Sequence, residues 1–215
     1  MSELTAIDIL VNPDEATLAR AREVNARMRE SVPSGFALDS DHQPHITTLQ
    51  RYVRTAELVH VFEAVEEVLA RTDGDQLSYQ AVSIRHTDWG VPGQGLAVLF
   101  LQPSPGVLSF QAGLLEAVTP FVGSDGTPHA FVTDDDEPTI SQSTMDWVEG
   151  FVPAQIGADK YIAHVTVGFA TFEDLKVIES DPFDACPVRP ISLSAYQLGN
   201  NGTARTELKR WTLRT

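Results

Sequence analysis

Apolar and polar residues recur along the chain with two spacings, two residues in some segments and three to four in others. Thr5–Val11 alternates between the two types and is rich in β-formers, which predicts a strand. In Glu15–Glu30 the apolar positions, which begin at Leu18 and end at Met28, recur every three or four residues, which predicts an amphipathic helix. The turn-like Asn12-Pro13-Asp14 between them supplies a capping side chain for that helix.

The same patterns predict the remaining elements. Further strands are expected at Gly35–Leu38, Gln43–Val53, Leu77–Arg85, Gly95–Leu101 and Lys160–Phe169, with a C-terminal hairpin of Ile191–Leu198 and Thr206–Leu213. Further helices are expected at Glu57–Ala70, Val107–Val122, Ser141–Val152 and Phe172–Glu179. Asp39-Ser40-Asp41 is expected to break the chain between the first two of these strands. The order is that of an α+β protein, and since no linker divides it, residues 1–215 are expected to form a single domain of two lobes.

Charge narrows the range of partners. The chain has 215 residues, a formal net charge of −15 and a sequence pI of about 4.6. Most of its surface therefore repels polyanions, and the basic face of a protein that grips long nucleic acid is absent. A phosphate-bearing partner is expected to be small, or to enter a local basic pocket.

The cysteine content and the apolar runs of the sequence bear on the expected cellular compartment. Cys186 is the single cysteine, so no internal disulfide is expected. The first residues lack the pattern of a secretory signal, and the longest apolar runs are too short to span a bilayer. A cytoplasmic protein that makes no membrane contact is the expectation.

Two strand-like segments carry the same short motif, His45-Ile46-Thr47 and His164-Val165-Thr166. Because side chains alternate in a strand, each histidine shares a face with its threonine, and the two lie roughly 7 Å apart along the backbone. A chain with six histidines should contain about half a copy of His-x-Thr by chance, so two copies in different halves are informative.

Two such strands facing each other would surround one small anion with two imidazoles and two hydroxyls. One neutral histidine could accept a proton while the other, protonated, donated one, because histidine titrates near neutral pH. The threonine hydroxyls could hold the non-bridging oxygens of a phosphate. This chemistry needs no metal and no cofactor.

The paired motifs, more than a hundred residues apart, resemble the signature of the two-histidine phosphoesterases, a superfamily that includes bacterial 2'-5' RNA ligase-like proteins and cyclic phosphodiesterases. The resemblance implies a bilobal α+β fold in which two pseudo-symmetric antiparallel-sheet lobes, with outer helices, flank a central cleft. It also implies that His45 and His164 are the general acid and base, in an order left open, and that Thr47 and Thr166 bind phosphate. Thr48 departs from the pattern, which favours an apolar residue there, and weakens the expected anchoring of the first strand.

The implied activity is metal-independent hydrolysis of a 2',3'-cyclic phosphate or another small phosphodiester. An RNA-end enzyme that cleaves or joins 2'-5' or cyclic termini is a second hypothesis, and a non-catalytic module that binds a phosphorylated ligand is a third. The expected partner is thus a small nucleotide or cyclic phosphate, with RNA ends as an alternative and extended DNA excluded by the charge.

Basic and aromatic residues near the motifs are candidates for substrate binding. Arg51 follows the first motif, and Lys160 and Tyr161 precede the second. Basic side chains gathered there would counter the overall negative charge, and a tyrosine could stack on a base.

Other motifs have weaker chemical interpretations. His42-x-x-His45 could form part of a metal site, but no third ligand stands nearby. The acidic run Asp134–Glu137 lacks the ligand spacing of a calcium loop and is expected to be a solvated loop. The glycine-rich Gly90–Gly95 lacks a P-loop lysine and is expected to join two strands.

Overall fold

The computed structural model describes residues 3–39, 42–135 and 137–213. Ser40 and Asp41 of the expected chain break, and Asp136 of the acidic run, lie outside the described residues. The strands are β1 (Leu4–Pro13), β2 (Ile46–Arg54), β3 (Tyr79–Thr87), β4 (Gln94–Pro103), β5 (His164–Thr171), β6 (Cys186–Val188), β7 (Pro190–Leu198) and β8 (Ala204–Thr212). The α-helices are α1 (Glu15–Ser31), α2 (Leu58–Ala70), α3 (Pro105–Val118), α4 (Gln142–Gln155) and α5 (Phe172–Ser180).

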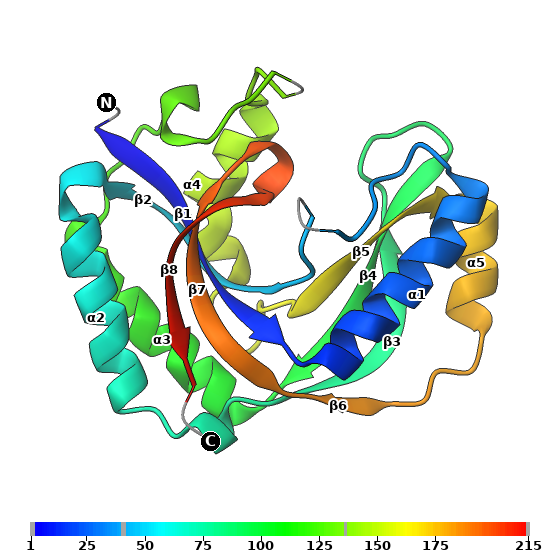
Figure 1. Ribbon diagram of the computed structural model, residues 1–215, viewed down its shortest axis with the longest axis horizontal. Helices are drawn as coiled ribbons and strands as arrows, with labels where there is room; N and C mark the ends of the chain where they lie inside the picture. Colours follow the sequence, from blue (N-terminus) through cyan, green and yellow to red (C-terminus); the bar gives the residue numbers. More distant parts are fainter. Residues whose placement is uncertain (1–2, 40–41, 136, 214–215) are drawn as a thin grey trace.

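The strands form two antiparallel sheets, one in each lobe (Figure 1). The first sheet has the order β2-β1-β7-β8, and the second has the order β5-β4-β3-β6. In each sheet a motif strand, β2 or β5, therefore occupies an edge. The expected α+β bilobal architecture is confirmed.

Two of the helices cross between the lobes. Helix α1 follows β1 of the first sheet but packs against β5 of the second, while α3 follows β4 of the second sheet and packs against α2 and β2 (Figure 1). The Asp14 carboxylate caps α1 by accepting a hydrogen bond of 2.9 Å from the Thr17 backbone N–H, as the turn predicted. The crossing ties the two lobes to each other.

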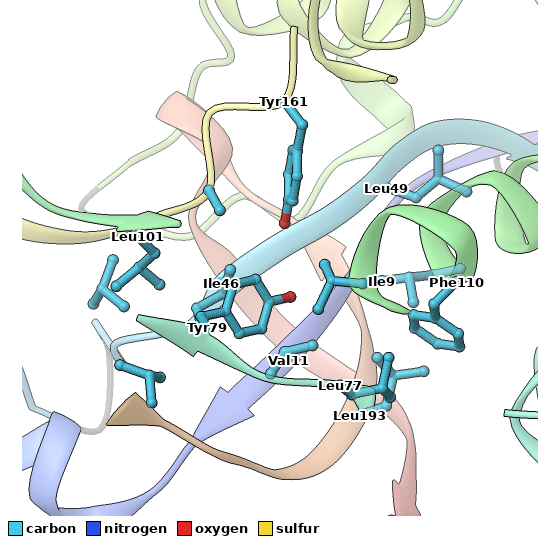
Figure 2. Close-up of a cluster of buried hydrophobic side chains, with 14 of the residues drawn as sticks. Ile9, Val11, Ile46, Leu49, Leu77, Tyr79, Leu101, Phe110, Tyr161 and Leu193 are labelled. Carbon is cyan, nitrogen blue, oxygen red and sulfur yellow. The ribbon is translucent and has the colours of Figure 1, made fainter. Parts of the chain in front are cut away.

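One hydrophobic cluster connects both sheets. It includes Ile9 and Leu193 from the first sheet together with Tyr79 and Leu101 from the second, and all four side chains are buried (Figure 2). Burial of this continuous core provides the main favourable term in folding and fixes the position of each sheet against the other.

The structure differs from the predicted elements in two places. The prediction of a strand at Gly35–Leu38 is wrong, because this segment forms a loop. The Phe36 ring packs edge-on against the ring of Phe169, with the centroids 5.9 Å apart. The short strand β6 was not expected, and it pairs with β3 through three residues. No described helix combines the length and the apolar character needed to cross a bilayer.

Candidate active site

The two motif strands meet between the lobes. Strands β2 and β5 are edges of different sheets and contact each other. His45 directly precedes β2, and His164 is the first residue of β5. The fold thus brings together two motifs that lie far apart in the sequence.

The burial of the motif residues alternates as strand geometry requires. Ile46 is completely buried, as is Val165 in the second motif. The two histidines and two threonines are partly exposed, which leaves them open to a ligand. Thr48 is also completely buried, so the first strand is anchored although this residue is polar.

Each imidazole is held by a hydrogen bond to the backbone carbonyl two residues before it. The Nδ1 atom of His45 lies 2.8 Å from the carbonyl oxygen of Gln43, and Nδ1 of His164 lies 2.8 Å from that of Ile162. A carbonyl oxygen can only accept, so Nδ1 carries the proton in each ring. Each Nε2 is then left as the atom that exchanges a proton with a ligand.

A β-bulge follows each motif at the equivalent position. In the first sheet Leu10 pairs with Thr47 while Ile9 pairs with Leu49, so Thr48 is the extra residue of β2. In the second sheet the pairing shifts in the same way around Val167, three residues after His164. Each bulge reverses the alternation of side chains beyond its motif.

The bulge in β5 is fixed by contacts from α1. Gly168 has φ of 142°, a conformation that favours glycine. The buried Asn25 side chain donates through Nδ2 to the carbonyls of Val167 at 2.8 Å and Phe36 at 3.0 Å. Asn25 therefore joins the His164 strand to the loop that leads to His45.

A buried carboxylate lies beneath the first motif. Asp8, in the middle of β1, is 0% exposed, and its Oδ2 accepts hydrogen bonds from Thr47 Oγ1 at 2.7 Å and from Gln50 Nε2 at 3.0 Å. The same oxygen lies 3.9 Å from Nε2 of His45. The other oxygen, Oδ1, is buried and has no hydrogen-bond partner in the described part of the chain.

The surroundings of the two histidines differ electrostatically. Burial raises the pKa of Asp8, while the nearby charge of His45 and the hydrogen bonds from Gln50 and Thr47 oppose this. Burial also lowers the pKa of His164 from 6.5, with a further contribution from the charge of His45, and the carbonyl of Ile162 opposes the shift. His164 therefore favours the neutral form, whereas the Asp8 carboxyl lies next to Nε2 of His45.

Tyr161 joins the two motif segments. Its hydroxyl donates to the Thr47 carbonyl at 2.8 Å, and its side chain is 8% exposed. Burial, followed by the nearby Tyr79, raises the pKa of Tyr161 well above 10. The structure thus places this candidate for base stacking inside the interface between β2 and the segment before β5.

The other two candidates for substrate binding are not brought to the histidines by any described contact. Arg51 lies beyond the bulge and pairs with Ile7, whose side chain belongs to the apolar core, whereas Thr47 and Gln50 contact Asp8 on the opposite face. Lys160 is exposed in the turn before β5. Strict alternation from Thr47 would put Arg51 on the motif face of β2, and the extra residue Thr48 puts it on the opposite face.

The structure shows the surroundings of His42 and of the acidic run, the two segments considered for metal binding. The His42 ring stacks on Phe36 with centroids 5.1 Å apart, and the described residues contain no group of three or more His, Cys, Asp or Glu placed to hold a metal ion. Asp134 of the acidic run is paired with Arg205.

Sequence analysis did not single out Asp8 and Gln50. A signal was present for Asp8, since it is the one acidic residue within an otherwise apolar or hydroxyl-bearing strand segment, and buried acidic residues are rare unless partnered. Gln50 enters the site only through the bulge, which the sequence does not reveal.

The chain is similar to known proteins in its structure, and the matches are found among solved structures. No protein-family model matches the chain, and no curated protein matches it either. Among solved structures, TT0787 of Thermus thermophilus is 17% identical, with 98% of each chain covered and a TM-score of 0.57. Escherichia coli LigT complexed with 3'-AMP is 17% identical, with 100% of each chain covered and a TM-score of 0.48.

The comparison of folds rests on TT0787, a two-histidine phosphoesterase superfamily member. At these identities the similarity concerns the fold. The chain therefore has the fold that the paired motifs implied.

Proposed function

We propose that the protein is a metal-independent phosphodiesterase that opens a 2',3'-cyclic phosphate or a similarly small diester with water. The observation that carries this proposal is the pair of imidazoles on adjoining edge strands, each anchored through Nδ1 and each with Nε2 left for a ligand. The net charge of −15 supports a small substrate over extended RNA.

The two histidines take different roles in the proposed mechanism. His164, whose pKa burial lowers, accepts a proton at Nε2 from the attacking water. His45, beside the Asp8 carboxylate, donates a proton from Nε2 to the leaving oxygen. The water oxygen forms a bond to phosphorus as the bond to the leaving ring oxygen breaks, and solvent then restores both histidines.

The two threonines bind phosphate in different ways. The side-chain hydroxyl of Thr166 has no hydrogen-bond partner within the described residues, so it is available to a non-bridging oxygen. The Thr47 hydroxyl donates to Asp8 and must turn away from it before it can donate to phosphate. Hydrogen bonds of this kind stabilise the charge that develops on phosphate oxygens in the transition state.

The test is turnover of 2',3'-cyclic nucleotides in excess EDTA. We expect His45→Ala and His164→Ala each to lower kcat by about 10²–10⁴-fold, as the loss of a general acid or base does. His60→Ala is the matched control, because this histidine is exposed on α2 and paired with Glu57. Loss of activity with chelator, or full activity in both variants, would contradict the mechanism. Binding of cyclic nucleotide without turnover would instead favour a non-catalytic module.

A further inference from the structure

A pocket of about 400 Å³ adjoins the candidate active site. Its wall includes Gln43 and Pro44, the two residues that directly precede His45. The Gln43 carbonyl also holds the His45 ring, through the 2.8 Å bond to Nδ1. The pocket and the proposed phosphate site therefore share one segment of chain.

The register of the first sheet places the pocket on the same face as the phosphate site. Thr47 pairs with Leu10, Leu10 with Ser194, and Ser194 with Arg210, which lines the pocket. Residues paired in this way share a face. At the usual spacing between strands, the Cα atoms of Thr47 and Arg210 are about 14 Å apart. The two sites thus lie on one face of the sheet, with the buried Leu10 and Ser194 between them.

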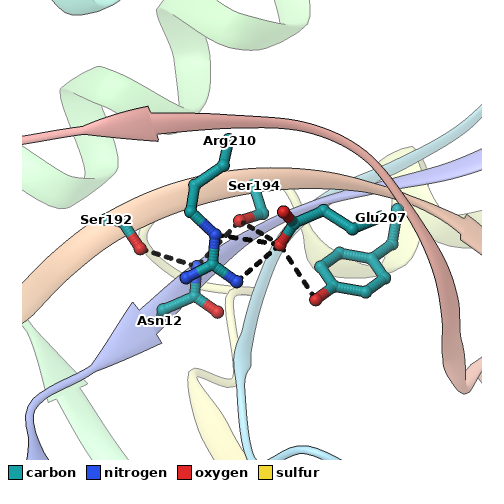
Figure 3. Close-up of polar contacts among 6 residues, drawn as sticks. Asn12, Ser192, Ser194, Glu207 and Arg210 are labelled. Carbon is teal, nitrogen blue, oxygen red and sulfur yellow. Dashed lines mark hydrogen bonds and ion pairs between the residues drawn. The ribbon is translucent and has the colours of Figure 1, made fainter.

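A network of hydrogen bonds fixes the polar side chains of the pocket (Figure 3). Asn12 donates through Nδ2 to the hydroxyls of Ser192 and Ser194, both at 2.9 Å. Arg210 donates to Oε2 of Glu207 through Nε at 2.9 Å and through Nη2 at 2.5 Å. Side chains held in this way lose little further freedom when a ligand binds.

One acceptor and one donor remain for a ligand. In the described part of the chain, Asn12 Oδ1 and Arg210 Nη1 have no hydrogen-bond partner. Glu207 balances the charge of Arg210, so the pair does not favour a second phosphate. The carbonyl and the guanidinium together match a ligand that presents a donor beside an acceptor.

The rest of the pocket lining is mixed, because Arg22 and Asp39 add charged side chains to an apolar part. Leu18 and Ile191 line it together with Pro44, and Ile191 is 52% exposed, which is high for a large apolar side chain. Pockets that bind organic ligands combine such walls with a few oriented polar groups. A flat heterocycle with donor and acceptor atoms on its edge has the chemistry that fits.

We propose that this pocket binds the nucleobase of a nucleotide whose phosphate lies between His45 and His164. The proposal rests on the proposed function. Asn12 Oδ1 accepts from the donor on the base edge, Arg210 Nη1 donates to the neighbouring acceptor, and the apolar part of the wall packs against the ring.

The experiment compares two substrates, 2',3'-cyclic AMP and the base-free diester bis(p-nitrophenyl) phosphate. We expect Arg210→Met and Asn12→Leu each to lower the ratio of kcat/KM for the nucleotide to that for the diester by about tenfold or more. Lys209→Met is the matched control, since Lys209 precedes Arg210 on β8 and pairs with Ala195 of the core-facing row. An unchanged ratio in both pocket variants would overturn the proposal.

A second variant and a binding assay separate this proposal from the proposed function. Ile191→Asn changes a side chain that is half exposed, and we expect it to lower the same ratio. If the wild type turns over neither substrate, the proposed function fails, and calorimetric titration with adenosine still tests the pocket. Binding to the wild type that Arg210→Met abolishes would support it, and equal binding or no binding to the wild type would overturn it.

Discussion

Replacement of Asp8 by Asn tests the proposed division of roles between the histidines. The variant keeps the size of the side chain and an oxygen that can accept from Thr47 and Gln50, but it removes a charge 3.9 Å from Nε2 of His45. Two unit charges at that distance interact by about 4 kcal/mol at an effective dielectric constant near 20, which is an upper limit because the His45 side chain is 22% exposed. We therefore expect kcat/KM at about pH 7.5 to fall by about 10–100-fold, since the proton-donating imidazole of His45 loses the carboxylate beside its Nε2.

The assay is the pH profile of kcat/KM for a 2',3'-cyclic nucleotide. We expect kcat/KM to be lower in Asp8→Asn than in the wild type throughout the neutral part of the profile. Asp181→Asn is the matched control, because it removes the same charge from a surface pair with Arg27. A profile that coincides with that of the wild type would refute the role of Asp8.

Stability measurements separate this charge effect from misfolding. The folded state raises the pKa of Asp8 above 3.8, so its contribution to stability is present below that pH and is lost as the pH rises. The wild type should therefore lose this contribution to its unfolding free energy between acid and neutral pH, and Asp8→Asn should not. The stability of the variant relative to the wild type should then increase as the pH rises. Urea unfolding at several pH values measures this, and a variant that becomes relatively less stable as pH rises would contradict the pKa direction.

Three further predictions concern the second motif and its supports. Burial lowers the pKa of His164, so wild-type stability should fall as pH drops below 6.5, and His164→Gln should flatten that fall in urea unfolding. Gly168→Ala should destabilise the protein by about 1–3 kcal/mol, because the new Cβ would lie 2.8 Å from Asn25 Nδ2 at φ of 142°; an unchanged Tm would contradict this. Tyr161→Phe should cost about 1 kcal/mol in unfolding free energy through loss of the bond to the Thr47 carbonyl, and an equally stable variant would show that this bond is dispensable.

The regular elements could be predicted because their causes are local. Alternation marked β1 and both motif strands, and apolar spacing marked α1, each within a few residues of its observed bounds. Asp14 capped the helix for which it was expected to supply a cap. Elements of this kind depend on side-chain pattern and on capping, which are visible in a single sequence.

The features that were missed depend on pairing across the fold. Strand β6 has three residues including Pro187, and it is a strand only because β3 lies beside it. The bulge at Thr48 is defined by its register with β1, which is why Gln50 rather than Arg51 reaches Asp8. Phe36 looked like part of a strand, yet its position is set by Asn25 and by the ring of Phe169.

The central claim is that both imidazoles act on one phosphate, and an NMR titration with inorganic phosphate tests it most directly. With ¹⁵N-labelled histidine, we expect the Nε2 signals of His45 and His164 to shift together along one binding curve with a single Kd, while His60 does not move. Shifts in only one of the two histidines, or two curves with different Kd values, would contradict the claim.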